Sequence, residues 1–216
     1  VAPPEYVQAL RRWCSDNGVL LICDEVQAGF GRSGRFWSFE HYGIVPDLIV
    51  CGKGISSSLP LAAVIGRPEI MDQYPPGSMT STHTGNPVAC MAAVANIRRI
   101  LDLHLTENAA RRGETLFRLL GQLQADFPRI IGVIHGRGLV AGVQVVRAGS
   151  KEPDSELAHK VVEKSYQKGL LFFAPVGFGG ATVKIAPPLI ITDAMIEDGI
   201  SVLHDAFAEA ATELGR

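Results

Sequence analysis

An apolar run that ends in two carboxylates places the strongest constraint on how this chain can fold. In "VLLICDEVQAGFGR" the residues 19–23 are all apolar, and Asp24 and Glu25 follow directly. A short, wholly apolar strand is typical of a sheet that is covered on both faces. Ligands of open α/β sheets bind beyond the carboxyl ends of the strands, so this pattern predicts that the acids lie at a ligand site.

The neighbouring patterns extend this prediction to an α/β layer. Residues 5–17 have the apolar spacing of an amphipathic helix, and residues 48–51 and 61–65 are apolar runs of strand length. A helix followed by three such runs predicts an α/β fold with a largely buried sheet.

The second half of the chain has smaller strands and more helix. Residues 85–127 have a helical pattern that starts at "GNP" and breaks near residues 104–106. The later segments are predicted to form both strands and helices. Two strands flank the turn of "IIGVIHGRGLVAGVQVV", and a helix follows at 156–168. Strands are then expected in "LLFFA" and "ATVKIAPP", before a last helix at 194–211. We therefore expect a domain boundary near Leu103, with domains at residues 1–103 and 104–216.

Composition narrows the class of function. The 216 residues carry a formal net charge of -2, whereas proteins that bind nucleic acids or membrane surfaces usually present a basic face. No apolar run approaches the roughly 20 residues that cross a bilayer. The four cysteines include no CxxC pair and the six histidines are scattered, which indicates free thiols in a reducing compartment such as the cytoplasm, and no metal site.

The chain opens "VAPPEYVQALRRW" without Met, so we expect it to be part of a longer polypeptide.

Lys53 is the second residue that suggests chemistry. It stands between Gly52 and Gly54, directly after the apolar run 48–51. In one interpretation Lys53 reaches solvent and Asp24 caps a loop. In the other, Lys53 is a desolvated amine that forms a Schiff base with an aldehyde. Pyridoxal phosphate is the obvious aldehyde, and Asp24 would then keep its ring nitrogen protonated.

A P-loop ATPase is an alternative, because four apolar residues before Asp-Glu also describe the magnesium-binding strand of that class. A P-loop requires G-x-x-x-x-G-K-[ST]. Here Asp47 stands where the first Gly belongs, and Gly54 stands where Ser or Thr belongs. A P-loop upstream of Val1 would still be compatible with the sequence.

Four segments together carry a resemblance to a known family. "LLICDEVQAGFGRSGRF", "PDLIVCGKGISSSLPLAAVIGR", "TSTHTGNPVAC" and "VKIAPPLIIT" resemble the class III aminotransferases, which include ornithine and 4-aminobutyrate enzymes. The resemblance extends over nearly all of the chain, which looks like the C-terminal half of such an enzyme. It implies the type I fold of pyridoxal-phosphate-dependent transferases, with part of the large mixed-sheet domain and the smaller C-terminal α+β domain.

The resemblance also implies roles for five residues. Asp24 would pair with the pyridinium nitrogen, Val26 would pack on one face of the ring, and Gln27 would bind the phenolic oxygen. Lys53 would form the Schiff base and then move the substrate proton. Thr82 would reach the cofactor phosphate of the neighbouring subunit, which implies a homodimer with shared active sites.

Each role has a simpler alternative, and the sequence leaves these open. Thr82 could cap the helix that follows Pro87. Gln27 could satisfy loop backbone, and Val26 could be an ordinary core residue. Glu25 and Arg32 are expected to be structural and to hold the Gly-rich loop together.

Lys184 marks a departure from the family. Many members have Arg at this position of "VKIAPPL", where its planar fork binds the substrate carboxylate. Lysine offers a point charge in place of the fork, so the substitution is not conservative. Lys184 would hold a carboxylate less strictly, or the substrate would be an amine that lacks a carboxylate there.

The resemblance predicts an aminotransferase that moves an amino group from an amino acid or amine to a 2-oxo acid or aldehyde. An amino-acid racemase or epimerase of the same family is the main alternative, and a non-catalytic dimerising scaffold is another. The family's phosphate loop and ring-stacking aromatic lie upstream of Val1, so we expect the isolated chain to be inactive.

Overall fold

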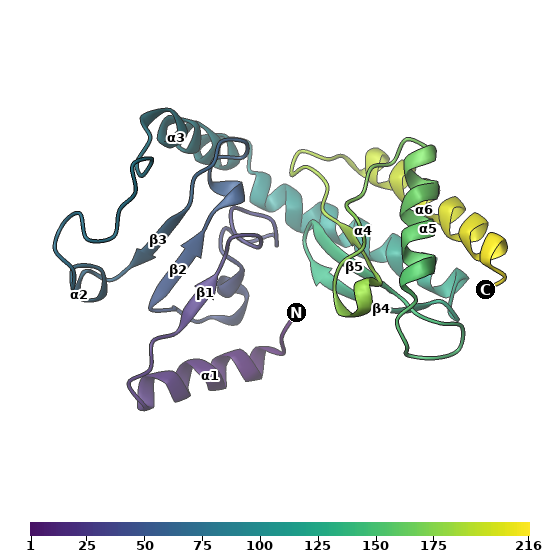
Figure 1. Ribbon diagram of the computed structural model, residues 1–216, viewed down its shortest axis with the longest axis horizontal. Helices are drawn as coiled ribbons and strands as arrows, with labels where there is room; N and C mark the ends of the chain where they lie inside the picture. The colour runs from purple at the N-terminus through teal and green to yellow at the C-terminus, as the bar shows by residue number, and fades with distance from the viewer. The chain divides into compact units, whose positions relative to one another are not determined.

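The computed structural model describes all residues 1–216, which form two compact units, Val1–Glu107 and Asn108–Arg216. The division lies four residues after the predicted boundary at Leu103. Each unit combines helices with a sheet, as the mixed α/β pattern predicted (Figure 1). None of the helices combines the length and apolar character that crossing a membrane requires.

The first unit is built on a three-stranded mixed sheet of order β1-β2-β3. Its helices and strands are α1 (Pro4–Asp16), β1 (Ile22–Asp24), β2 (Leu48–Cys51), β3 (Ala63–Gly66), α2 (Pro68–Met71) and α3 (Pro87–Asp102), with short 3-10 turns η1 (Ser38–Tyr42) and η2 (Lys53–Ile55). The pair β1–β2 is parallel and β2–β3 is antiparallel (Figure 1). Because β1 and β2 run in the same direction, their carboxyl ends lie at one edge of the sheet.

The strand predicted at residues 19–23 begins later than expected. Gly18 adopts a left-handed conformation with φ 65°, and the Val19 amide donates to the Cys14 carbonyl at 2.9 Å. Val19 thus belongs to the end of α1, and β1 starts only at Ile22.

Part of the sheet is open in this chain, so a sheet covered on both faces stays a prediction for the longer polypeptide. Ile22 of β1 is 54% exposed, and Val64 and Ile65 of β3 are about as open. The buried cluster of this unit instead lies around the residues Phe30, Cys51, Ile55, Ala93 and Ile100.

The second unit packs helices around an antiparallel sheet of order β4-β5-β6. Its elements are α4 (Leu105–Asp126, from Asn108 onward), β4 (Ile131–Arg137), β5 (Val140–Val145), α5 (Ser155–Gln167), η3 (Phe178–Gly180), β6 (Thr182–Ile185) and α6 (Asp193–Leu214). Leu116 and Leu120 of α4 join Phe207 of α6 in one core cluster with the sheet. The unit therefore has its own hydrophobic core.

The segment "LLFFA" (residues 170–174), predicted as a strand, is not one. Leu171 and Phe173 are both more than 70% exposed, and no residue of the segment pairs with the sheet. The strand assigned to "ATVKIAPP" is confirmed as β6, which pairs with β5.

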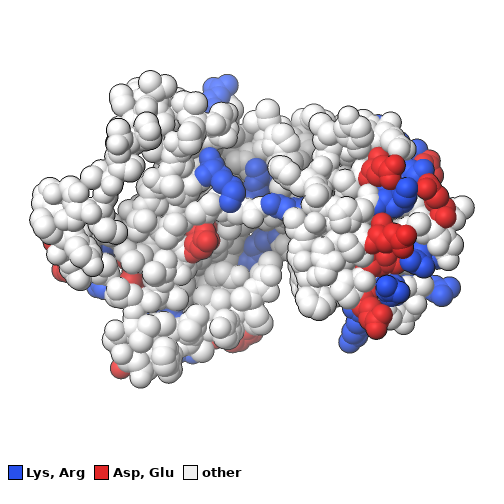
Figure 2. Space-filling view, in the orientation of Figure 1, with Lys and Arg blue, Asp and Glu red and all other residues white.

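Charged side chains of the second unit gather over α5 and α6, which lie side by side (Figure 2). Lys160 and Lys164 of α5 both pair with Glu213 of α6, and Lys168 pairs with Glu209. Opposite charges alternate on this surface, so it offers no single-sign field to a charged partner.

Candidate active site

The parallel pair β1–β2 brings Asp24 and Lys53 to the same edge of the sheet. Asp24 is the last residue of β1 and lies opposite Val50 of β2. Lys53 follows the end of β2 after one residue, Gly52. A carboxylate and an amine thus lie beyond the carboxyl ends of adjacent strands, where ligands bind in sheets of this kind.

Lys53 is held in an unusual backbone conformation. It opens η2 with φ 39°, in the left-handed region that costs a non-glycine residue about 1–2 kcal/mol. The turn is fixed from α3, where the Asn96 side-chain amide donates to the Gly54 and Ile55 carbonyls at 2.7 and 3.3 Å. Lys53 is exposed in this chain, so the expected desolvation of its amine stays a prediction for the longer polypeptide. It forms no ion pair, which leaves the amine available to a ligand.

The two adjacent acids have different environments. Asp24 is exposed, and its Oδ1 accepts a hydrogen bond from the Val26 amide at 3.0 Å. Glu25 is 1% exposed and accepts from the Ser38 amide, the Ser38 hydroxyl and the Phe39 amide at 3.0, 2.6 and 3.0 Å. These three bonds join Glu25 to η1 across the Gly-rich loop. The structural role expected for Glu25 is therefore confirmed, and Asp24 is the acid that can meet a ligand.

Val26 and Gln27 lie in the turn that follows Asp24. A Cβ atom placed on Gly52 would be 3.6 Å from Val26 Cγ1, so half-buried Val26 lies beside the residue that precedes Lys53. Gln27 is exposed, and its side chain donates to no backbone group of the loop. The alternative in which Gln27 satisfies loop backbone is therefore not what the structure has.

Thr82 lies in an exposed turn before α3, and it does not cap that helix. Asn86 is the cap, because its side chain accepts from the Val88 and Ala89 amides at 3.0 and 3.3 Å. The hydroxyls of Ser81 and Thr84 bond each other at 3.0 Å, which leaves the Thr82 hydroxyl outside this turn's hydrogen bonds.

Lys184 lies in the second unit, whereas the other predicted site residues lie in the first. It is half-buried on β6 and lines a mainly apolar groove of about 320 Å³. Its Nζ lies 5.8 Å from the centroid of the Phe173 ring, within range of a cation–π interaction. The groove can accommodate an apolar group beside one positive charge.

The side chains at this sheet edge fit an aldehyde cofactor with a pyridine ring. An amine without a protein partner, an exposed carboxylate and a β-branched side chain lie at one sheet edge. No group of three or more His, Cys, Asp or Glu residues is arranged to hold a metal ion. All four cysteines are free.

Comparison with known proteins identifies the family. The model of the aminotransferase class-III family matches residues 1–207, so the chain belongs to the class III aminotransferases. This family uses pyridoxal phosphate and has the fold that the resemblance implied. With the family established, the P-loop alternative no longer applies.

Particular relatives include both transaminases and racemases. The chain is 38% identical over 210 residues to the 5-aminovalerate aminotransferase of Pseudomonas putida, covering 97% of this chain and 49% of the relative. It is 38% identical over 212 residues to the leucine/methionine racemase of Thermococcus litoralis, covering 97% and 47%. The chain thus spans about half the length of the relatives that it matches.

A solved structure agrees with this assignment of fold. The ornithine aminotransferase of Toxoplasma gondii superposes with a TM-score of 0.88 at 32% identity, covering 100% of this chain and 49% of that one. That enzyme was crystallised in the presence of oxidised glutathione, with pyridoxal phosphate at partial occupancy in its active site.

Proposed function

We propose that the intact protein is a pyridoxal-phosphate-dependent aminotransferase that moves an amino group from an amino acid or amine donor to a 2-oxo acid or aldehyde acceptor. The observation that carries this proposal is the placement of Lys53 and Asp24 at the carboxyl ends of adjacent parallel strands, with neither side chain in an ion pair. The family match over residues 1–207 supports it.

Each residue at the sheet edge would have a separate role toward the cofactor. When bound, pyridoxal phosphate supplies an aldehyde that condenses with amines and a cationic ring that withdraws electrons. Lys53 would hold the cofactor through its amine, and its Nζ would then carry the proton that leaves the donor's α-carbon. Asp24 would keep the ring nitrogen protonated by placing a carboxylate against it. Val26 would contact the ring, and Gln27 would donate to its phenolic oxygen.

Thr82 and Lys184 extend the proposal to the partner subunit and the substrate. Thr82 would bind the cofactor phosphate of a second copy in a homodimer, and its hydroxyl is not used by the helix cap that Asn86 provides. Lys184 would hold a substrate carboxylate as a point charge, with less demand on its orientation than an arginine fork makes.

The test is borohydride reduction of the intact protein with its cofactor, followed by peptide mapping. We expect the label on Lys53, and we expect Lys53→Ala to lose both the yellow colour and transamination. Lys151→Ala is the matched control, because Lys151 is also exposed and forms no ion pair. A label on a different lysine, or full activity of Lys53→Ala, would contradict the proposal.

A racemase is the second candidate, favoured by the Thermococcus litoralis relative, which is as similar as the Pseudomonas putida aminotransferase. Both reactions begin with removal of the α-proton, and only transamination consumes a 2-oxo acid. Measuring 2-oxo acid consumption beside optical rotation of the amino acid separates the two. Rotation that decays with no 2-oxo acid consumed would favour the racemase.

A further inference from the structure

The register of β1 against β2 is weakly specified by its own residues. The ladder contains the three pairs Ile22↔Leu48, Cys23↔Ile49 and Asp24↔Val50. A ladder of three pairs offers few contacts of its own to select this alignment. A slip of one residue would turn Asp24 to the opposite face of the sheet. Contacts at the ends of the ladder must therefore fix where Asp24 lies relative to Lys53.

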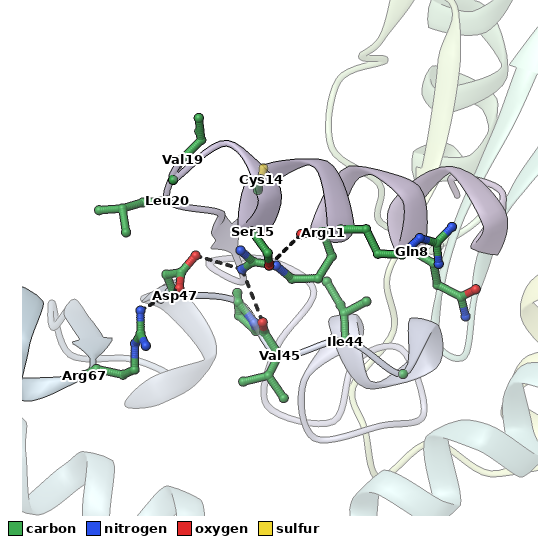
Figure 3. A pocket seen from close by; sticks show the side chains of 14 residues that line it. Gln8, Arg11, Cys14, Ser15, Val19, Leu20, Ile44, Val45, Asp47 and Arg67 are labelled. Atoms are coloured by element: carbon green, nitrogen blue, oxygen red, sulfur yellow. Dashed lines mark hydrogen bonds and ion pairs between the residues drawn. The ribbon is translucent and has the colours of Figure 1, made fainter.

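Asp47, directly before β2, makes such contacts at the amino-terminal end. Its Oδ2 accepts from the Leu21 amide at 2.8 Å and from the Arg11 guanidinium at 2.7 Å. Its Oδ1 accepts from Arg67 at 3.0 Å. Figure 3 shows the carboxylate between the two arginines, with Arg11 also reaching the Val45 carbonyl.

Backbone hydrogen bonds join the same residues. The amides of Asp47 and Leu48 both donate to the Leu21 carbonyl, at 2.8 and 3.2 Å. Together with the side-chain bond from the Leu21 amide, they tie the residue before β1 to the residue before β2. The carboxylate thus joins α1, the start of β1 and the end of β3, which are elements distant in the sequence.

We propose that Asp47 is a positioning residue of the active site: it sets the β1–β2 register and thereby the placement of Asp24 relative to Lys53. The inference rests on the proposed function for its catalytic meaning. Asp47 is not catalytic itself, because it stands at the far end of the strands, three residues or about 10 Å from the site edge. Arg11, with 17% of its side chain exposed, is the main partner, and Arg67, at 64%, is the lesser one.

The test compares Asp47→Asn with Asp72→Asn in the intact protein with its cofactor. Asp72 is an exposed acid of the same unit that forms no ion pair, so its variant removes a charge and no contact. In Asp47→Asn we expect amide hydrogen exchange of residues 20–25 to become about tenfold faster, because a charge-assisted contact is lost at the strand end. We also expect the dissociation constant for pyridoxal phosphate to rise about tenfold and kcat to fall, with KM for the donor within twofold of wild type.

Arg67→Gln provides a second variant, because its exposed side chain can be removed without leaving a buried charge. It should accelerate exchange of the same segment about twofold to threefold. If both Asp47→Asn and Arg67→Gln exchange residues 20–25 no faster than Asp72→Asn does, the proposal is overturned. Equal acceleration in α3 would also overturn it, since that result indicates general loosening of the unit.

Failure of the proposed function gives a different result. Wild-type protein would then show no borohydride label on Lys53, whereas the exchange measurement reports the register without any cofactor chemistry.

Discussion

The buried carboxylate of Glu25 allows a stability prediction worked from individual contacts. In Glu25→Ala the amides of Ser38 and Phe39 lose their acceptor in a buried site, and the Ser38 hydroxyl loses a 2.6 Å bond. A buried donor left unpaired costs about 1–3 kcal/mol, and a neutral hydrogen bond contributes about 1 kcal/mol. We therefore expect Glu25→Ala to lower the free energy of unfolding by at least about 3 kcal/mol.

Glu25→Gln should cost less, for a geometric reason. The Ser38 hydroxyl and the Phe39 amide both donate to Oε1, and only the Ser38 amide donates to Oε2. A glutamine can place its oxygen at the Oε1 position and keep two of the bonds, while its NH2 group opposes the remaining amide. The expected loss is about 2 kcal/mol.

The assay is urea unfolding of the intact protein, followed by the fluorescence of Trp37 in the same loop. Every other tryptophan of the intact protein, the exposed Trp13 included, is replaced by Phe in all variants. With an m-value of about 3 kcal/mol/M, the Glu25→Ala midpoint should fall by about 1 M. Glu40→Gln, an exposed acid of η1, is the control and should change stability by no more than about 0.5 kcal/mol. Equal midpoints for Glu25→Ala and Glu40→Gln, or equal losses for the alanine and glutamine variants, would refute this account.

Two further predictions concern stability in each unit. The Leu21 amide and then the Arg11 guanidinium hold the pKa of Asp47 below its ordinary value, so this carboxylate stabilises the fold above about pH 4, and its contribution is lost as pH falls through the lowered folded pKa. In urea titrations at several pH values, the stability gap between wild type and Asp47→Asn should therefore close in acid, and a gap independent of pH would contradict the assignment. In α4, a Cβ on Gly113 would lie 2.6 Å from the backbone of the β4–β5 turn, whereas one on Gly121 would meet nothing within 4 Å. Thermal unfolding should show Gly113→Ala destabilised by about 1–3 kcal/mol and Gly121→Ala stabilised by up to about 1 kcal/mol, and shifts of the same sign would count against this packing.

The sequence predicted best where a local pattern determines the structure. Residues 48–51 were predicted as a strand and form β2 with the same bounds, because Asp47 and Gly52 interrupt the apolar run on both sides. The break predicted near residues 104–106 falls at His104, whose φ is 51°. The segment "LLFFA" failed because apolar composition alone does not distinguish a strand from a segment that lines a groove.

The candidate site could be anticipated in part. Asp24 and Lys53 directly follow apolar runs, so their placement at the sheet edge could be predicted from order along the chain. Asp47 was not anticipated as a positioning residue, because its partners Arg11, Leu21 and Arg67 are 36, 26 and 20 residues away. One sequence feature could have drawn attention to Asp47, because it is an acid directly before an apolar strand, whereas Asp24 is an acid directly after one.

Because the backbone of Lys53 is left-handed, the stability of the fold and the presence of an amine favour different residues at position 53. Glycine would occupy a φ of 39° without penalty but has no amine, while lysine brings the amine and stores conformational energy in every folded molecule. Contacts made by other residues must therefore offset the strain at Lys53, because a glycine that relieved it would remove the amine on which the proposed function depends.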